Sequence, residues 1–132
     1  MNAFIIELEN RPGSLASVAE AIAQRGINLT SVSGATVGQK GSVAILTNDE
    51  AGTRSALGAA GFAYREIGLV SASLEDKPGT LAAAARQLAN AGVNIEALLP
   101  TGMDGGKVRF AIGVSDTGAA QRALGELATT GV

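Results

Sequence analysis

The chain has 132 residues, a formal net charge of −2 and hydrophobic side chains at 46% of its positions. It contains neither cysteine nor histidine, which excludes disulfides, thiolate chemistry and the commonest general acid–base group. Aromatic residues make up 3% and the basic residues form no stripe, so we expect no nucleic-acid partner. No apolar run approaches the roughly 20 residues of a membrane span and no basic leader opens the chain, which indicates a cytoplasmic protein without a membrane partner.

The first half of the chain predicts a strand, a helix, two strands, a second helix and a last strand. Apolar residues alternate at positions 4–8, and an apolar stripe with helical spacing follows at 15–22. Pro12 is expected at or near the first helical position, and Gly26 just beyond the end of the helix. The next two strands are expected at 27–37 and 42–46. The second helix is expected from the Asn48-Asp49 cap to residue 60, and the last strand at 62–67.

The second half of the chain repeats this pattern. Glu9-Asn10-Arg11-Pro12-Gly13-Ser14-Leu15 recurs as Glu75-Asp76-Lys77-Pro78-Gly79-Thr80-Leu81, and Gly26-Ile27-Asn28 recurs as Gly92-Val93-Asn94. Self-similarity of this kind indicates one supersecondary unit used twice. We therefore expect two domains, 1–67 and 68–132, with the last strand of the second short or missing. Each reads as a ferredoxin-like β-α-β-β-α-β unit, an α+β fold with an antiparallel sheet and helices on one face.

The two Pro-Gly loops are the first candidates for a binding site. Free N–H groups in the first turn of a helix attract anions such as a carboxylate, and Gly13 lets a ligand approach the backbone closely. The alternative interpretation is an ordinary helix start, with the Asn or Asp as its cap. The candidate ligand-binding residues in these loops are Asn10, Arg11, Pro12, Gly13 and Ser14, and Asp76, Lys77, Pro78, Gly79 and Thr80.

Asn28 and Asn94 are the second candidates. Each lies two residues beyond a helix-ending glycine and between apolar neighbours, where asparagine is uncommon in a strand. A side-chain amide offers a donor and an acceptor, which suits an amino-acid head group that carries one charge of each sign. The alternative is that each Asn caps its own turn. No pair of carboxylates is placed as a catalytic dyad, and we expect no metal and no cofactor.

These motifs resemble the ACT domain, the small-molecule regulatory module of amino-acid metabolism. The resemblance covers both halves and implies a tandem ACT protein with ferredoxin-like units whose sheets pair side by side, with an amino acid bound at the junction. The first loop is similar to that of the serine-binding ACT domain of phosphoglycerate dehydrogenase. Carried over by motif, this implies that Asn10 and Asn28 contact an effector, with Asp76 and Asn94 at the same places in the second half.

The resemblance implies a non-catalytic, amino-acid-binding regulatory protein, expected as a homodimer and as a possible partner of an amino-acid biosynthetic enzyme. The alternative function is an adaptor or regulatory subunit that pairs with a metabolic enzyme and binds no small ligand. We expect the units to pair through the strands that begin at Ile27 and Val93, within one chain or across a dimer. Each site would then join the loop of one unit to the Asn of the other, and the charge of Asp76 would weaken the second site.

Overall fold

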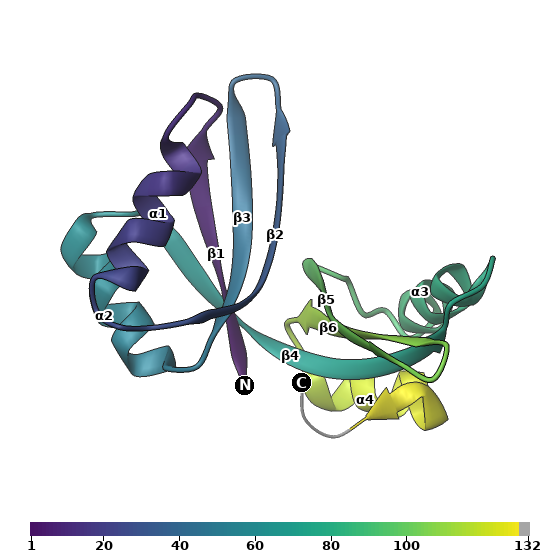
Figure 1. Cartoon of the computed structure of the whole chain (residues 1–132). Helices are drawn as coiled ribbons and strands as arrows, with labels where there is room; N and C mark the ends of the chain where they lie inside the picture. The colour runs from purple at the N-terminus through teal and green to yellow at the C-terminus, as the bar shows by residue number, and fades with distance from the viewer. Residues whose placement is uncertain (130–132) are drawn as a thin grey trace. The chain divides into compact units, whose positions relative to one another are not determined.

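The computed structural model describes residues 1–129, and in it the chain forms two units. The first is Asn2–Glu66, and the second comprises Met1 and the described residues from Ile67 onward. Each unit carries an antiparallel sheet and two α-helices (Figure 1). The predicted α+β fold with repeated ferredoxin-like units is therefore confirmed.

The first unit follows the expected order of elements, because its apolar pattern changes from a period of two to a period of 3.6 and back. Its elements are β1 (Asn2–Glu9), α1 (Ser14–Ala23), β2 (Leu29–Val37), β3 (Lys40–Thr47), α2 (Glu50–Ala60) and the start of β4 (Tyr64–Glu75). Strand β3 lies between β1 and β2, so β2 is an edge strand. On the other side of β1, the Glu7 N–H donates to the Ala63 carbonyl at 3.1 Å.

The second unit repeats this order. Its elements are the rest of β4, α3 (Thr80–Asn90), β5 (Ala97–Asp104), β6 (Lys107–Val114), α4 (Thr117–Leu124), the 3₁₀ turn η1 (Gly125–Leu127) and β7 (Ala128–Thr129). The two-residue strand β7 pairs with Ser71 and Ala72 of β4. The rest of the expected last strand would fall at positions 130–132, outside the described residues. Strand β5 is the edge strand beyond β6.

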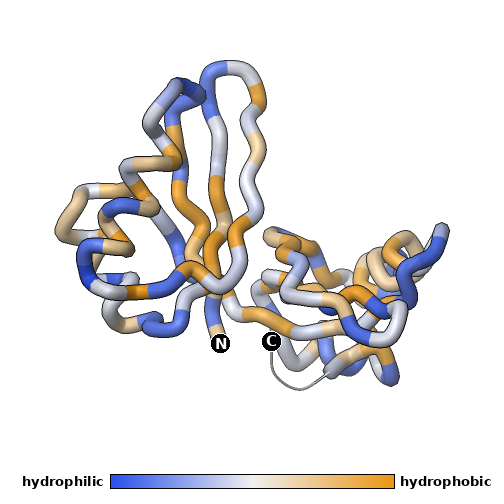
Figure 2. The backbone as a smooth tube through the Cα atoms, viewed as in Figure 1, coloured by the Kyte–Doolittle hydropathy of each residue, from blue (hydrophilic) through white to orange (hydrophobic). Residues whose placement is uncertain are grey.

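Each unit has its own hydrophobic core between its sheet and its helices. Figure 2 shows hydrophobic stretches along the strands and a hydrophilic loop before α1. The first core includes Phe4, Ile6, Val18, Ile22, Ile45 and Leu57, and the second includes Val70, Ala72, Leu74, Leu88, Ile112 and Leu124. Burying a large aliphatic or aromatic side chain contributes about 1.5–3 kcal/mol, so these residues hold the scaffold on which the loops are mounted.

The helices α1 and α3 begin just after their prolines, so Pro12 is near the first helical position but not at it. Helix α1 begins at Ser14 and α3 at Thr80, and the capping positions are Gly13 and Gly79, with φ of 90° and 89°. Pro12 therefore lies before the cap and not at the first helical position. A left-handed cap favours glycine, because an L side chain is disfavoured there.

The second and fifth strands also start later than expected, at Leu29 and Ala97. The cause lies at the helix ends, where the Ile27 N–H donates to the Ile22 carbonyl at 3.4 Å and the Val93 N–H to the Leu88 carbonyl at 2.9 Å. These bonds complete the helix terminus, so Ile27 and Val93 face the core instead of joining a strand. The left-handed glycines expected beside them are confirmed, with φ of 68° at Gly26 and 74° at Gly92.

Candidate functional site

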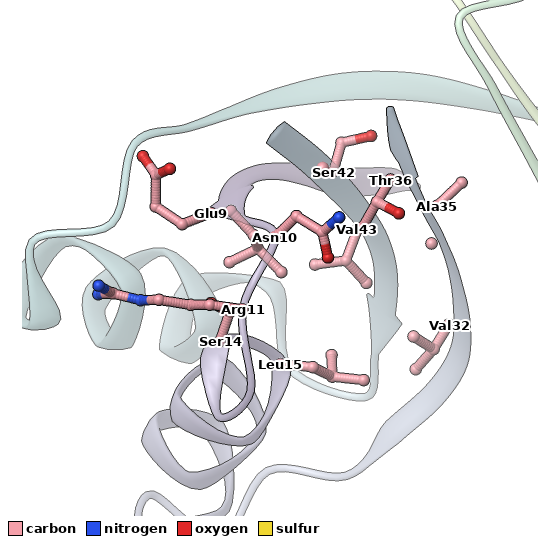
Figure 3. A pocket seen from close by; sticks show the side chains of 13 residues that line it. Glu9, Asn10, Arg11, Ser14, Leu15, Val32, Ala35, Thr36, Ser42 and Val43 are labelled. Carbon is pink, nitrogen blue, oxygen red and sulfur yellow. The ribbon is translucent and has the colours of Figure 1, made fainter. Parts of the chain in front are cut away.

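A pocket of about 370 Å³ lies in the first unit, between the loop that precedes α1 and the strands β2 and β3 (Figure 3). It opens beside an edge strand and beside the first turn of a helix. Its lining residues are Leu8, Glu9, Asn10, Arg11, Ser14, Leu15, Val32, Gly34, Ala35, Thr36, Gly41, Ser42 and Val43.

One wall of the pocket is apolar and only half covered. Leu15 from the first turn of α1 is 51% exposed, and Val32 from β2 is 42% exposed. Val43 forms the floor between them, and its neighbour across the strands is Gly34. A glycine inside a strand leaves space above the sheet where another side chain would stand. The arrangement therefore offers an aliphatic surface that a small ligand could cover.

The other wall is polar and comes from the loop itself. The Asn10 side-chain N–H donates to the Gly38 carbonyl at 2.8 Å, and its backbone N–H donates to the Gln39 carbonyl at 2.9 Å. Asn10 thus fastens the loop to the β2–β3 turn and does not cap the helix, since α1 has no side-chain cap hydrogen bond. The side-chain oxygen of Asn10 is left as an acceptor, and the first-turn N–H groups of α1 are left without a side-chain cap.

Ser14 adds a hydroxyl at the start of α1. Within residues 1–129 no hydrogen-bond partner is found for its Oγ, although the residue borders the pocket. The pocket thus combines an unpaired hydroxyl, an amide oxygen and a helix N-terminus on one side with aliphatic side chains on the other. Such a site can bind a small molecule that has a polar head and an apolar body.

The charged residues of the loop are turned outward. Figure 3 shows the side chains of Glu9 and Arg11 extending away from Leu15 and Val32. Glu9 forms an ion pair with Lys40, and the hydrogen bond from Lys40 lowers the pKa of the Glu9 carboxyl and raises the pKa of the lysine. Both partners are well exposed, so this pair contributes little to stability.

The structure places the predicted residues of the first loop in two groups. Asn10, Arg11 and Ser14 line the pocket, whereas Pro12 and Gly13 shape the loop without lining it. The sequence reasoning missed the strand residues, chiefly Val32, Gly34 and Val43. The signal that could have found them is Gly34, since a glycine in the middle of a strand often marks a place where something approaches the backbone closely.

Asn28 is not brought to this pocket. It is exposed, its backbone N–H donates to Asn48 Oδ1 at 3.0 Å, and its carbonyl accepts from the Asn48 N–H at 3.2 Å. Asn94 is likewise exposed, three residues before β5. Neither side-chain amide has a hydrogen-bond partner in the described part of the chain. Asn28 does not line the pocket of about 370 Å³, and Asn94 does not line a pocket of about 520 Å³ in the second unit.

The second Pro-Gly loop borders a different hollow. Lys77 and Thr80 line a pocket of about 520 Å³ between α3 and the segment after α4, whereas Asp76, Pro78 and Gly79 do not line it. Lys77 pairs with Glu75 at 2.8 Å, and this hydrogen bond lowers the pKa of the Glu75 carboxyl. The Thr80 hydroxyl contacts the Glu75 carbonyl at 2.6 Å and the Lys77 carbonyl at 3.2 Å.

Two features of the described residues bear on other kinds of function. Residues 1–129 contain no group of three or more acidic, histidine or cysteine side chains arranged to hold a metal ion. Among the helices of the same residues, none is both long and apolar enough to cross a membrane.

The two units define the class of protein as a ferredoxin-like α+β chain, with a pocket beside the loop that opens α1. Within that class, residues 3–60 match the sequence model of the family described as ACT domain. The match covers most of the first unit, including the Asn10 loop and β2. No curated protein sequence matches the chain.

Solved structures similar to the chain span nearly all of it. The protein BT0572 from Bacteroides thetaiotaomicron is 27% identical, with a TM-score of 0.75 and coverage of 95% of this chain and 86% of that one. The regulatory subunit of aspartate kinase from Thermus thermophilus, in its ligand-free form, is 21% identical, with a TM-score of 0.67 and coverage of 96% and 91%. The regulatory subunit of aspartate kinase from Thermus flavus is 20% identical, with a TM-score of 0.62 and coverage of 93% and 88%. At 21% and 20% identity, the two kinase subunits show that this chain shares their fold.

Proposed function

We propose that the chain is a non-catalytic, amino-acid-binding regulatory protein made of two ACT units, which acts in the cytoplasm as a homodimer. The observation that carries this proposal is the pocket beside α1 in the first unit, where the ACT match and the polar loop coincide. The repeat in the sequence extends the ACT assignment to the second unit. The full set of candidate residues in both loops, with Asn28 and Asn94, belongs to this proposal.

The chemistry of the pocket favours an aliphatic α-amino acid. The helix N-terminus and the Ser14 hydroxyl suit an α-carboxylate, and the free side-chain oxygen of Asn10 suits an α-ammonium group. The aliphatic wall of Leu15, Val32 and Val43 would then cover the ligand side chain, which contributes about 0.8 kcal/mol for each buried methylene.

The partner is proposed to be an amino-acid biosynthetic enzyme, whose activity the chain would adjust when the amino acid binds. Support comes from the family match of the first unit and from structural relatives that are themselves regulatory subunits of a kinase. An effector acts by binding two states of its target with different affinities, and an edge strand next to the pocket is a place where such states could differ.

A thermal-shift screen across the proteinogenic amino acids tests the proposal. A ligand at 100 times its Kd adds about 2.7 kcal/mol of stability, which raises the melting temperature of a domain of this size by several degrees. We expect the largest shifts from L-valine, L-leucine and L-isoleucine.

Ser14→Ala and Ser55→Ala form a matched pair for this screen. Ser14→Ala should reduce the shift, because a hydrogen bond to a charged group contributes about 1.5–3 kcal/mol. Ser55→Ala, at an exposed position of α2 outside the pocket, should leave it unchanged. A flat response to every amino acid would contradict ligand binding and favour the adaptor that binds no small molecule.

A further inference from the structure

The two units can be compared at the pocket through the residues that lie opposite one another in their strands. The second hairpin has a register shift between Pro100 and Gly102, and the first has none at the corresponding place. In the first unit Val43 lies opposite Ile6 on one side and opposite Gly34 on the other. In the second unit Phe110 lies opposite Ala72 and opposite Pro100. Phe110 is therefore the counterpart of Val43, and Pro100 is the counterpart of Gly34.

The second unit carries larger side chains at these places. A phenyl ring replaces an isopropyl group, and a pyrrolidine ring replaces the hydrogen of Gly34. Gly41, which lies opposite Leu8 and lines the pocket, corresponds to Val108, which lies opposite Leu74. Two exchanges go in the other direction: Ala72 stands in place of Ile6, and Gly102 in place of Ala35. Together they remove fewer carbon atoms than these three exchanges add.

The available space in the first unit depends on the missing side chain at residue 34. A Cβ at Gly34 would lie 3.2 Å from the Ser42 carbonyl oxygen and 3.5 Å from a methyl group of Val43. In the second unit Phe110 is half-buried and packs against the core of that unit. The extra carbon atoms of Phe110 are thus part of the packed structure.

The hydroxyl groups at the starts of α1 and α3 also differ in a way that favours ligand binding in the first unit. Ser14 Oγ has no hydrogen-bond partner within residues 1–129, whereas the Thr80 hydroxyl is engaged by the Glu75 carbonyl at 2.6 Å. The hydroxyl that the first unit can offer to a ligand is therefore already hydrogen-bonded within the protein in the second unit.

We infer that, of the two units, only the first forms a ligand pocket between its Pro-Gly loop and its edge hairpin, and that Phe110 and Pro100 close the corresponding place in the second unit. The hollow beside Lys77 and Thr80 lies between α3 and the segment after α4 and is a different place. The chain would then bind one aliphatic amino acid in this way, in the pocket of the first unit. This inference rests on the proposed function. It also gives a steric cause for unequal sites, in addition to the charge of Asp76.

Methyl NMR of the full chain tests the inference with an equimolar mixture of the proteinogenic amino acids as the probe. Leu15 and Val32 report on the first pocket, and Leu81 and Leu98 report on the corresponding place in the second unit. We expect chemical-shift changes at the first pair only. Changes of similar size at Leu81 and Leu98 would overturn the inference and leave the proposed function standing, whereas no change at any of the four would overturn both.

Two blocking variants and one control complete the experiment. Val43→Phe places at position 43 the phenyl ring that the second unit has at Phe110. Because Ile6 leaves less room beside it than Ala72 does in the second unit, the ring has to enter the pocket. This variant should abolish the changes at Leu15 and Val32. Leu15→Phe narrows the pocket from its exposed rim and provides the same test if Val43→Phe folds poorly. Phe110→Val should leave the changes in the first unit intact. Full retention of the change at Val32, which both blocking variants keep, would overturn the inference.

Discussion

Gly13 sets the direction in which the polar loop enters α1, since it has a φ of 90° and caps the helix. A Cβ added there would meet no atom within 4 Å, so substitution changes the backbone preference and not the packing. We expect Gly13→Ala to lower the free energy of unfolding by about 1–2 kcal/mol, the cost of a left-handed conformation for an L-residue. Urea unfolding measures this, and an unchanged midpoint would show that the loop can adopt another conformation at no cost.

Glu66 is the second residue whose environment allows a prediction. It accepts hydrogen bonds from Arg54 and, at 3.1 Å, from the Asn2 side chain, and its own side chain is only 23% exposed. The hydrogen bond from Arg54 is the main reason that the pKa of the Glu66 carboxyl lies below its ordinary value. The folded state therefore binds the proton less readily than the unfolded state does.

The sign of the pH dependence follows from this lowered pKa. The stabilisation from Glu66 is present in full above the unfolded pKa of about 4.3 and is lost as the pH falls through the lower folded value. We expect Glu66→Gln to flatten the fall in the urea midpoint between about pH 5 and pH 3 relative to the parent chain. Glu20→Gln, at an exposed position of α1, serves as the control and should leave the slope unchanged.

The residue scale also shows how much of the site could be predicted. The Pro-Gly loop was found because helix starts leave backbone N–H groups free and because the motif occurs twice. The floor and the apolar wall were missed, since Val32 and Val43 look like ordinary strand residues until the register places Gly34 opposite Val43. Register depends on which strands pair, and a single sequence does not contain that information in a local pattern.

At the scale of elements, α2 contains two glycines that should respond in opposite ways to the same substitution. A Cβ at Gly58 would meet nothing within 4 Å, so Gly58→Ala should stabilise the chain by about 0.5–1 kcal/mol through helix propensity. A Cβ at Gly52 would lie 2.3 Å from Asp49 Oδ2 and 2.8 Å from the end of Ile27. This Cβ would displace the Asp49 carboxylate. That carboxylate caps the helix, because its Oδ1 accepts a hydrogen bond from the Gly52 N–H at 2.9 Å.

Gly52→Ala should therefore lower the stability by about 1–3 kcal/mol, as overpacking and loss of a cap do. Comparing the urea midpoints of the two variants isolates the steric effect, because both exchange glycine for alanine in one helix. If both variants gain stability, the cap at Asp49 can move without cost, and the contact geometry at the start of α2 is not restrictive.

The elements themselves were largely predictable, and the exceptions have local causes. The cap predicted at Asn48-Asp49 is confirmed at Asp49, and Asp116 caps α4 in the same way, because a short side-chain acceptor before a helix usually caps it. The extent of β4 was not foreseen: the closing strand of the first unit and the opening strand of the second form one strand of 12 residues. Gly68 was read as the start of a new unit, yet a glycine with an extended backbone continues a strand as other residues do.

At the scale of the whole molecule, Asn28 and Asn94 carry a prediction about how a binding site is completed. Both side-chain amides are exposed and have no hydrogen-bond partner in the described chain, and the pocket beside α1 includes neither of them. If an Asn completes the site, the pocket of the first unit has to receive it from another unit, in the same chain or in a second copy. Because the first unit holds the open pocket, Asn94 is the residue expected to complete it.

We therefore expect Asn94→Ala to weaken amino-acid binding, while Asn28→Ala leaves it nearly unchanged. Loss of one hydrogen bond to a charged group costs about 1.5–3 kcal/mol, which corresponds to a Kd raised by at least about tenfold. Calorimetry with the amino acid that gives the largest thermal shift measures both variants. Equal losses from the two substitutions would contradict the assignment of Asn94 to the first pocket.

Mixing two variants distinguishes a site within one chain from a site across a homodimer. Ser14→Ala weakens the pocket from the loop side, and Asn94→Ala weakens it from the side that the other unit supplies. If the site joins two copies, a mixed dimer has one pocket with both substitutions and one with neither, because the residues exchange across the two-fold axis. Unfolding and refolding the two variants together should then restore part of the tight binding, as a high-affinity fraction in calorimetry. A mixture that binds only as weakly as its components would place Ser14 and Asn94 of the same chain in one site.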